Sequence, residues 1–176
     1  KSFMFPGSKN QKRHEKNFKS PAFRLKCPKR TKTENKETTR KYIALVWGVI
    51  KEDTATIDAP IGRDTNDRKK MAVTSINSKD AITHLRVLKR YKEATLVELQ
   101  LETGRTHQIR VHMSHIGHGI IGDELYGYED ENLINRQALH AYSLVFNQPR
   151  TKERLEFKAD LPNDIKHLIE KLRKNN

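Results

Sequence analysis

Residues 42–50, with the sequence Tyr-Ile-Ala-Leu-Val-Trp-Gly-Val-Ile, form an almost unbroken apolar run. The run is short for a helix and rich in β-branched and aromatic side chains, so it predicts a strand. Because apolar residues occupy successive positions, both faces of this strand have to be covered. Such a strand belongs in the core of a sheet that has other elements packed against it.

The clearest alternation of apolar and polar residues lies over 95–102, where Val97, Leu99 and Leu101 alternate with charged or polar residues. This period of two predicts a half-exposed, antiparallel strand. A short turn at Lys92 and Glu93 predicts that it forms a hairpin with a strand over 81–91. Further strands are expected over 71–75, 138–146 and 154–159, and a short strand or a turn is expected over 53–58.

Two helices complete the expected elements. Ile109, Met113 and Ile116 form one apolar stripe, with Thr106 as the expected N-cap and Gly117 as the expected end. A second helix is expected after Asn163, with a core face of apolar residues at 165, 168, 169 and 172. The order of these elements predicts an α+β fold with a mixed, mainly antiparallel sheet and flanking helices.

Positive charge is concentrated at the N-terminal end of the chain. The first forty residues contain thirteen basic and three acidic residues, whereas the other 136 carry a net charge of only +3. We therefore divide the chain into a basic, irregular arm (1–39) and a domain (40–176). A basic arm favours RNA, DNA or an acidic membrane surface. The alternative is a solvated tail that only keeps the chain soluble.

Other features of the composition concern the compartment. No apolar stretch reaches the ~18 residues that a membrane-spanning helix needs. The chain has one cysteine, Cys27, and a lone thiol fits a reducing compartment. A cytoplasmic protein is expected.

The segment from Leu99 to Met113 is the best candidate for a functional site. A strand ends, Gly104 makes a turn, and a helix begins at once with Arg105, His107 and Arg110 in its first turns. The free N–H groups at a helix start attract anions, and two arginines strengthen that attraction. The alternative is that both arginines are ordinary surface residues of an amphipathic helix.

Two other groups of residues are candidates for a functional site. Four histidines, at 107, 112, 115 and 118, raise the question of a zinc site. No cysteine lies nearby and no acidic residue falls within 107–118. We therefore expect no metal, and instead polar helix residues and a buried, hydrogen-bonded histidine. The loop from Arg63 to Lys70 carries four basic residues, which suits phosphate contacts. The alternative is a solvated hairpin tip.

Five blocks in order resemble one enzyme family. The blocks are residues 40–44 (RKYIA), 60–63 with 68–73 (PIGR and RKKMAV), 81–86 (AITHLR), 104–112 (GRTHQIRVH) followed by 122–127 (GDELYG), and 136–141 (RQALHA). Over about residues 40–173 the chain resembles the RluA/RluD-like pseudouridine synthases, which modify large-subunit ribosomal RNA and some transfer RNA.

The resemblance implies an α+β domain with a central RNA cleft and conversion of uridine to pseudouridine. It implies neither a cofactor nor a metal. It does imply that the target base is extruded from its stack. Tyr42 is expected to lie against that base and Arg110 to pair with the catalytic carboxylate. Arg63, Arg68 and Lys70 are expected to meet RNA phosphate. A further group, expected to hold the turn and the nearby RNA backbone, comprises Arg105, His107 and Gln108.

The family's His-Arg-Leu-Asp block, whose Asp is catalytic, has no counterpart upstream of Tyr42. Residues 1–39 contain no Asp, and Asp64 and Asp123 are not expected to substitute. Arg110 is then expected to lack its carboxylate, and the strand over 42–50 to have an exposed edge. We therefore expect a pseudouridine synthase that is inactive as this chain alone, or else a non-catalytic RNA-binding module. The expected partner is RNA, not DNA or a membrane.

One arrangement is central to this hypothesis. Tyr42 and Arg110 are expected to face a shared cavity that is large enough for an extruded base.

Overall fold

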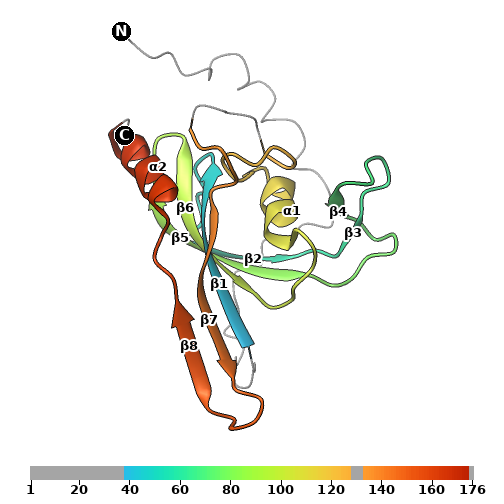
Figure 1. Ribbon diagram of the computed structural model, residues 1–176. Coiled ribbons are helices and arrows are strands. Elements are labelled where there is room, and N and C mark those ends of the chain that lie inside the picture. Colours follow the sequence, from blue (N-terminus) through green and yellow to red (C-terminus); the bar gives the residue numbers. More distant parts are fainter. Residues whose placement is uncertain (1–37, 128–132, 175–176) are drawn as a thin grey trace.

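The computed structural model describes residues 38–127 and 133–174 (Figure 1). In chain order the elements are β1 (Thr38–Trp47), β2 (Thr54–Asp58), β3 (Ile61–Arg63), β4 (Met71–Val73), β5 (Ile82–Arg90), β6 (Ala94–Leu101), α1 (Gln108–His115), β7 (Leu139–Asn147), β8 (Arg154–Lys158) and α2 (Asn163–Lys174). Six strands form one sheet in the order β2-β5-β6-β1-β7-β8, and β3 and β4 form a separate hairpin. All these pairings are antiparallel, so the α+β fold expected from the sequence is confirmed.

The apolar run forms the middle of the sheet. Strand β1 pairs with β6 on one side and β7 on the other, and Ile43 to Val46 are buried. The prediction of a strand covered on both faces is therefore confirmed over these residues. The expected exposed edge is wrong, because β7, almost a hundred residues later in the chain, pairs along the side that was thought to be free. Within the described residues, the edges of this sheet are β2 and β8.

The hairpin of β5 and β6 is confirmed, and its turn contains Lys92 and Glu93. Strand β6 is more buried than its alternation predicts, since even Glu98 is only 9% exposed. Its carboxylate accepts a hydrogen bond from Tyr142 of β7 and lies 3.1 Å from Arg86 and 3.6 Å from Lys41. These side chains from three neighbouring strands cover a position that the pattern alone assigns to solvent.

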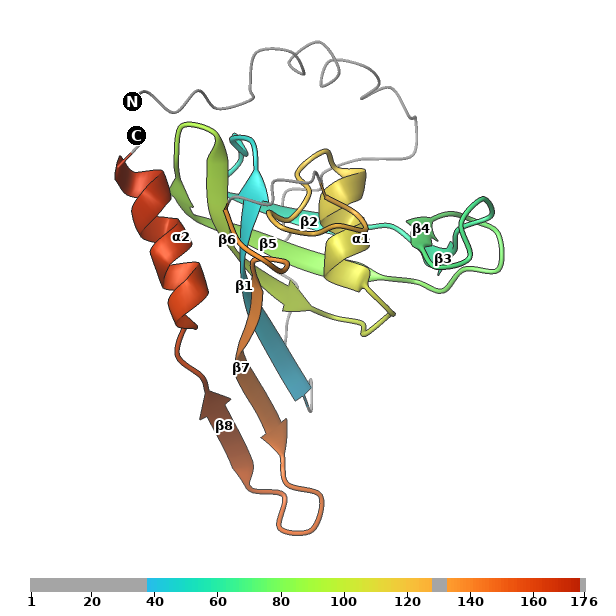
Figure 2. The same ribbon diagram turned by 45° about the horizontal axis from the view of Figure 1, so that its top comes forward.

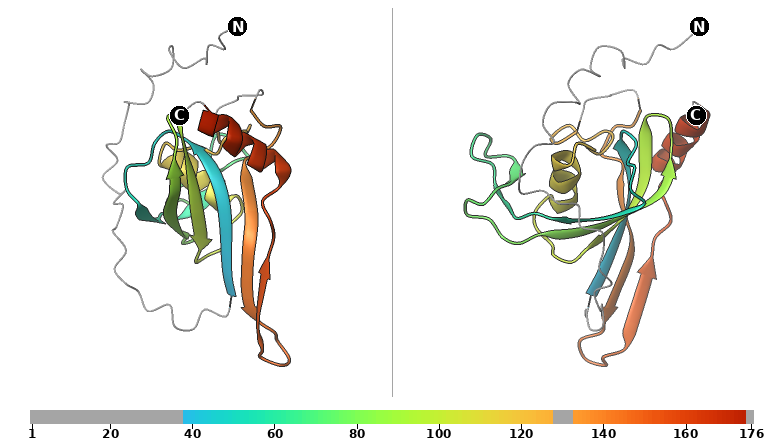
Figure 3. Two further views of the ribbon diagram at one scale, coloured as in Figure 1. Left: turned by 90° about the vertical axis from the view of Figure 1, so that its left-hand side faces the viewer. Right: turned by 180° about the vertical axis from the view of Figure 1, so that it is seen from behind.

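The two helices lie on opposite faces of the sheet (Figures 1 and 3). On α2, Ile165, Leu168 and Leu172 are buried, as the apolar spacing predicts. Strand pairing shows which residues lie on the other face of the sheet, the one that α1 covers. Tyr42 is opposite Leu99 and Leu99 is opposite Leu85, so the three share one face. Thr83, two residues before Leu85, is on the same face and bonds to α1.

Two hairpins extend away from the core (Figure 2). The hairpin of β3 and β4 lies beside α1, and the hairpin of β7 and β8 extends from another end of the sheet. The register of β1 and β7 shifts between Lys41 and Tyr42, which leaves Tyr142 as an extra residue on β7. Such a bulge increases the local twist of a sheet and changes the direction of nearby side chains.

Helix α1 starts differently from the prediction. The N-cap is His107, whose φ is 55°, and no side chain caps the helix, so the expected cap by Thr106 is wrong. Gly117 ends the helix as expected, with a φ of 81° and a hydrogen bond from the next amide, His118, to the Met113 carbonyl. The left-handed conformation of His107 turns the chain sharply between β6 and α1.

Candidate active site

The turn between β6 and α1 is held by one buried amide side chain. Gln108 is 2% exposed and makes four hydrogen bonds inside the protein. Its Nε2 donates to the Ile82 carbonyl and to Thr83 Oγ1, each at 3.0 Å. Its Oε1 accepts from Thr103 Oγ1 at 2.8 Å and from the Arg105 amide at 2.9 Å. Gln108 therefore holds the turn, as the resemblance implies, and presents no free polar group to RNA in this arrangement.

Arg110 is paired, which corrects the expectation that it would lack a carboxylate. Its Nε donates to Asp123 Oδ2 at 2.8 Å and its Nη2 to Asp123 Oδ1 at 2.7 Å. The amides of Leu125 and Tyr126 also donate to Oδ1, at 3.1 Å each. The Asp123 side chain has no exposed surface, and that of Arg110 is 17% exposed. These four hydrogen bonds compensate the buried Asp123 carboxylate for the loss of its contacts with water.

The electrostatics of this pair are strongly coupled. Burial alone would raise the pKa of Asp123, but the hydrogen bonds from Arg110 and from the backbone amides outweigh it and lower the pKa. The same carboxylate raises the pKa of Arg110. Both groups are therefore charged at neutral pH, and the pair is a bidentate ion pair.

A glycine explains why Asp123 lies so close to α1. Gly122 has a φ of 73°, and a Cβ at this position would lie 2.3 Å from the Arg136 carbonyl oxygen. Only glycine fits a left-handed turn this close to another backbone segment. The 122–127 block that resembles the family is thus the sequence signal for Asp123, but the pairing with Arg110 was not foreseen.

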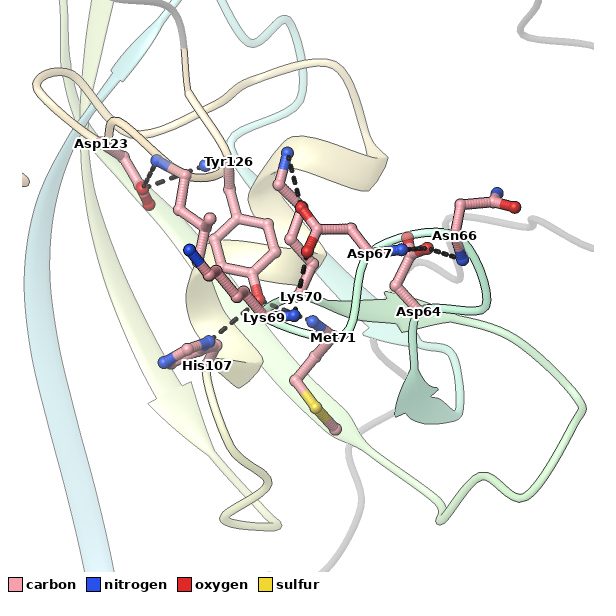
Figure 4. A network of polar contacts seen from close by, with 10 residues as sticks. Asp64, Asn66, Asp67, Lys69, Lys70, Met71, His107, Asp123 and Tyr126 are labelled. Atoms are coloured by element: carbon pink, nitrogen blue, oxygen red, sulfur yellow. Dashed lines mark hydrogen bonds and ion pairs between the residues drawn. The ribbon is translucent and has the colours of Figure 1, made fainter.

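Tyr126 joins His107 to Met71 of the β3–β4 hairpin (Figure 4) and also contacts Arg110. The Arg110 guanidinium lies 4.8 Å from the centre of the Tyr126 ring. The Tyr126 hydroxyl accepts a hydrogen bond from the Met71 amide at 2.8 Å and lies 2.9 Å from His107 Nδ1. Burial and the nearby Arg110 lower the pKa of His107, which favours the neutral ring, whose Nδ1 can accept a hydrogen bond from the Tyr126 hydroxyl.

The basic loop, residues 63–70, is ordered by its own carboxylates. Asp64 accepts hydrogen bonds from the Asn66 and Asp67 amides, at 2.7 and 3.0 Å. Arg63 donates to the Arg68 carbonyl at 2.7 Å, and Lys70 lies 4.0 Å from Asp67. The Met71 amide connects this loop to Tyr126, so the structure brings the loop and the start of α1 together.

Arg105 lies at the outer side of the turn, where its Nε donates to the Asp80 carbonyl at 2.9 Å. Tyr42 lies on the face of the sheet that carries α1, in the wall of a cavity of about 270 Å³ between β1, β7 and β8. Arg110 is not among the described residues that line this cavity. The expectation that Tyr42 and Arg110 face one shared cavity stays a prediction.

The histidines are dispersed. His112 is fully buried and bonded to Thr83 Oγ1 and to the Ala59 carbonyl, at 2.9 Å each, which is the buried histidine that the sequence predicts. His118 bonds to the Trp47 carbonyl at 2.8 Å. In the described ranges, 38–127 and 133–174, no group of three or more His, Cys, Asp or Glu residues is arranged to hold a metal. No helix of this part of the chain is long and apolar enough to cross a membrane.

Comparison with known proteins decides which family this arrangement represents. Residues 22–115 match the family described as RNA pseudouridylate synthase. The chain belongs to the RNA pseudouridylate synthase family. The match starts eighteen residues before Arg40, the start that the sequence motifs indicated, so part of the basic arm belongs to the region that the family shares.

Relatives and solved structures agree with this assignment. An uncharacterized RNA pseudouridine synthase, YlyB of Bacillus subtilis, is 57% identical over 141 residues, which are 80% of this chain and 46% of that protein. Ribosomal large subunit pseudouridine synthase D of Neisseria meningitidis is 42% identical, with 80% of this chain and 40% of the relative covered. The structure of human RNA pseudouridylate synthase domain containing 1 superposes with a TM-score of 0.66 at 30% identity, over 78% of this chain and 66% of that one. The chain thus spans less than half the length of these two bacterial relatives.

Proposed function

We propose that this chain is the RNA-facing part of a pseudouridine synthase that acts on ribosomal RNA in the cytoplasm. The observation that carries the proposal is the cluster at the start of α1. There, Arg110 is fixed by Asp123 and Tyr126 beside the basic loop, on the face of the sheet to which Tyr42 belongs. Family membership and the relatives named for ribosomal RNA support RNA as the substrate.

In this proposal the residues of the chain bind and position the substrate. Tyr42 lies against the extruded uracil and can exchange the proton at the carbon that becomes bonded to the sugar. Arg63, Arg68, Lys70 and Arg105 hold phosphates near the cluster. In the reaction the bond between the sugar and a ring nitrogen breaks and a bond from the same sugar carbon to a ring carbon forms. A carboxylate at the sugar is needed for that exchange.

We propose further that the chain by itself does not catalyse this exchange. The Asp123 side chain has no exposed surface and accepts four hydrogen bonds from the protein, so it is enclosed and out of reach of a sugar. Asp64 is engaged by two amides of its own loop, and these bonds lower its pKa. In this proposal neither carboxylate is the catalytic group, and that role belongs to the Asp of the family's His-Arg-Leu-Asp block.

Tritium release from ribosomal RNA labelled at carbon 5 of uridine tests this proposal. The chain alone should release none above background. A longer product that includes a His-Arg-Leu-Asp block should release tritium, and Tyr42→Phe in that product should lower the rate by at least about a hundredfold, the lower range for a lost proton-transfer group. Turnover by the chain alone would contradict the proposal that this chain is inactive by itself. A longer product without turnover would contradict the proposal that the chain is part of a pseudouridine synthase.

A non-catalytic RNA-binding module is the second candidate. It is favoured by the surplus of thirteen positive charges together with the engagement of both candidate carboxylates. The two candidates differ in the longer product, because a module binds ribosomal RNA without tritium release in either form.

A further inference from the structure

The cavity between β1, β7 and β8 contains charges that the proposed function does not use. Among the described residues that line it, Arg40 and Lys158 are basic and none is acidic. Tyr42, Leu144 and Phe157 provide apolar surface. Lys158 is itself paired with Glu156 at 3.0 Å on the exposed side of β8, so Arg40 is the cation of greater interest.

Arg40 has an incompletely satisfied side chain. Its Nε is buried and has no hydrogen-bond partner among the described residues. Its guanidinium lies close to the turn before α1, where a Cβ on Gly104 would be 2.7 Å from Nη1 and 3.1 Å from Nη2. A buried polar group without a partner calls for an explanation, and an anion in the adjoining cavity is one. Arg40 also joins the strand of Tyr42 to the turn of the α1 motif.

The apolar wall of the same cavity is exposed on β7 and β8. Phe157 is 55% and Leu144 is 38% exposed, although both are large apolar residues. Leu144 pairs with Arg40 on one side and with Phe157 on the other, so the three share the face that carries Tyr42 and α1. The Phe157 ring stacks on Phe146, with 5.8 Å between centroids and 13° between planes. This stacking holds Phe157 as a flat platform on β8, with Leu144 of β7 between it and Arg40.

We propose that this cavity is a subsite for one nucleotide of single-stranded RNA, with its phosphate on Arg40 and its base on Phe157. A guanidinium suits phosphate, and an aromatic platform suits any base. The charge of the cavity favours a nucleotide over an apolar polypeptide segment as the occupant. The subsite rests on the proposed function, since it extends the RNA-binding face from the basic loop to the β7–β8 hairpin.

The test measures binding of a fluorescent single-stranded oligouridylate of about ten nucleotides between 50 and 200 mM salt, by anisotropy. Arg40→Gln should weaken binding and flatten the slope of log K against log salt by about 0.7, the value for one phosphate contact on a single strand. Arg40→Lys should keep the slope and bind less tightly. The matched control is Arg173→Gln on α2, at the opposite face, which should leave the slope unchanged.

The base is tested separately. Phe157→Ala should weaken binding at least about fivefold, the lower range for one stacked base, without a change in slope. Phe157→Leu should recover only part of the loss. Thermal unfolding of each variant identifies any that fail to fold. If Phe157→Ala fails to fold, the RNA affinity of Phe157→Leu tests the stacked base instead.

The outcomes separate this subsite from the proposed function. Wild-type binding that Arg40→Gln and Phe157→Leu leave unchanged overturns the subsite alone. If the Phe157 variants keep their RNA affinity but change their oligomeric state, this face binds a polypeptide. That outcome also overturns the subsite. A wild-type chain that does not bind the oligouridylate at 50 mM salt overturns both the subsite and the RNA-facing role.

Discussion

Arg110 and Asp123 show how a single ion pair can organise a site. Both charges are largely out of water, and the carboxylate has four donors around it. A buried pair of this kind contributes little net stability compared with an apolar pair, yet the loss of one partner is expensive. Its main effect is to fix the direction of the guanidinium beside Tyr126 and the basic loop.

Asp123→Ala should lower the free energy of unfolding by about 3–5 kcal/mol, because it leaves Arg110 charged and partly buried without a partner. Asp123→Asn should cost less, since the amide oxygen can still accept some of the four hydrogen bonds. Urea unfolding measures both. Glu124→Ala, at an exposed neighbouring position, is the control. A loss below about 1 kcal/mol in Asp123→Ala, the upper range for an exposed pair, would show that the pair is weakly coupled to the fold.

His112 predicts how stability depends on pH. Burial lowers the pKa of this ring below its ordinary value near 6.5. The unfolded chain therefore takes up a proton at a higher pH than the folded chain does. The stability that the neutral ring contributes is complete above about pH 6.5 and is lost as pH falls from there through the lower folded-state pKa.

Urea unfolding at pH 8, 7, 6 and 5 checks this expectation. The wild type should lose stability below pH 6.5, and His112→Gln should show a flatter dependence there as well as a lower stability at pH 8. His167→Gln, on the exposed side of α2, should keep the wild-type slope. Equal slopes in the wild type and in His112→Gln would assign the acid sensitivity to other groups.

At the scale of elements, the turn from β6 into α1 connects the parts of the candidate site. Gly104 and the left-handed His107 turn the chain, and Gln108 ties the turn to β5 through the Ile82 carbonyl and Thr83. Tyr126 then ties α1 to β4 through the Met71 amide. The start of α1 is thereby held against both β4 and β5.

Gln108→Ala should lower the free energy of unfolding by about 2–4 kcal/mol, because it removes one buried amide and leaves several of its four partners unsatisfied. Urea unfolding measures the loss. Gln100→Ala, at a partly exposed position of the adjoining strand, removes the same side chain and should cost less than about 1 kcal/mol. Similar losses in the two variants would mean that the turn does not depend on Gln108.

At the scale of the whole molecule, positive charge is present both in the N-terminal arm and in the described domain. The first forty residues carry most of the net charge, and the family match begins inside them at residue 22. The described part adds the basic loop and Arg40, on the same side of the sheet as α1. Affinity for RNA should therefore have an arm contribution and a domain contribution.

Deletion of residues 1–21, which hold six basic residues and one acidic residue, should separate them. The shortened chain should bind single-stranded RNA more weakly and with a smaller salt slope, because fewer counterions are released. Anisotropy titrations at several salt concentrations measure both quantities. A variant with the six basic residues of this segment changed to Gln is the matched control and should behave as the deletion does. An unchanged slope in both would identify the arm as a solubilising tail.

Local sequence patterns predicted most elements to within a few residues. The apolar run at 42–50, the alternation at 95–102 and the stripe from Ile109 to Ile116 each became the expected strand or helix. Such patterns report the burial of a face, which is a local property of the chain. The start of α1 escaped them, because a histidine in a left-handed conformation has no side-chain signature comparable to a capping threonine.

The amino-acid sequence by itself determined the α+β class, the family motifs and the concentration of charge in the arm, since each depends on which residues are close along the chain. Tertiary structure alone decided the partner of Arg110, the place of β1 between β6 and β7, and the meeting of Arg40 with Tyr42 and Phe157 in one cavity. These contacts join residues from 13 to more than 100 positions apart. No periodicity encodes such contacts, because they arise only when the sheet closes and its strands find their register.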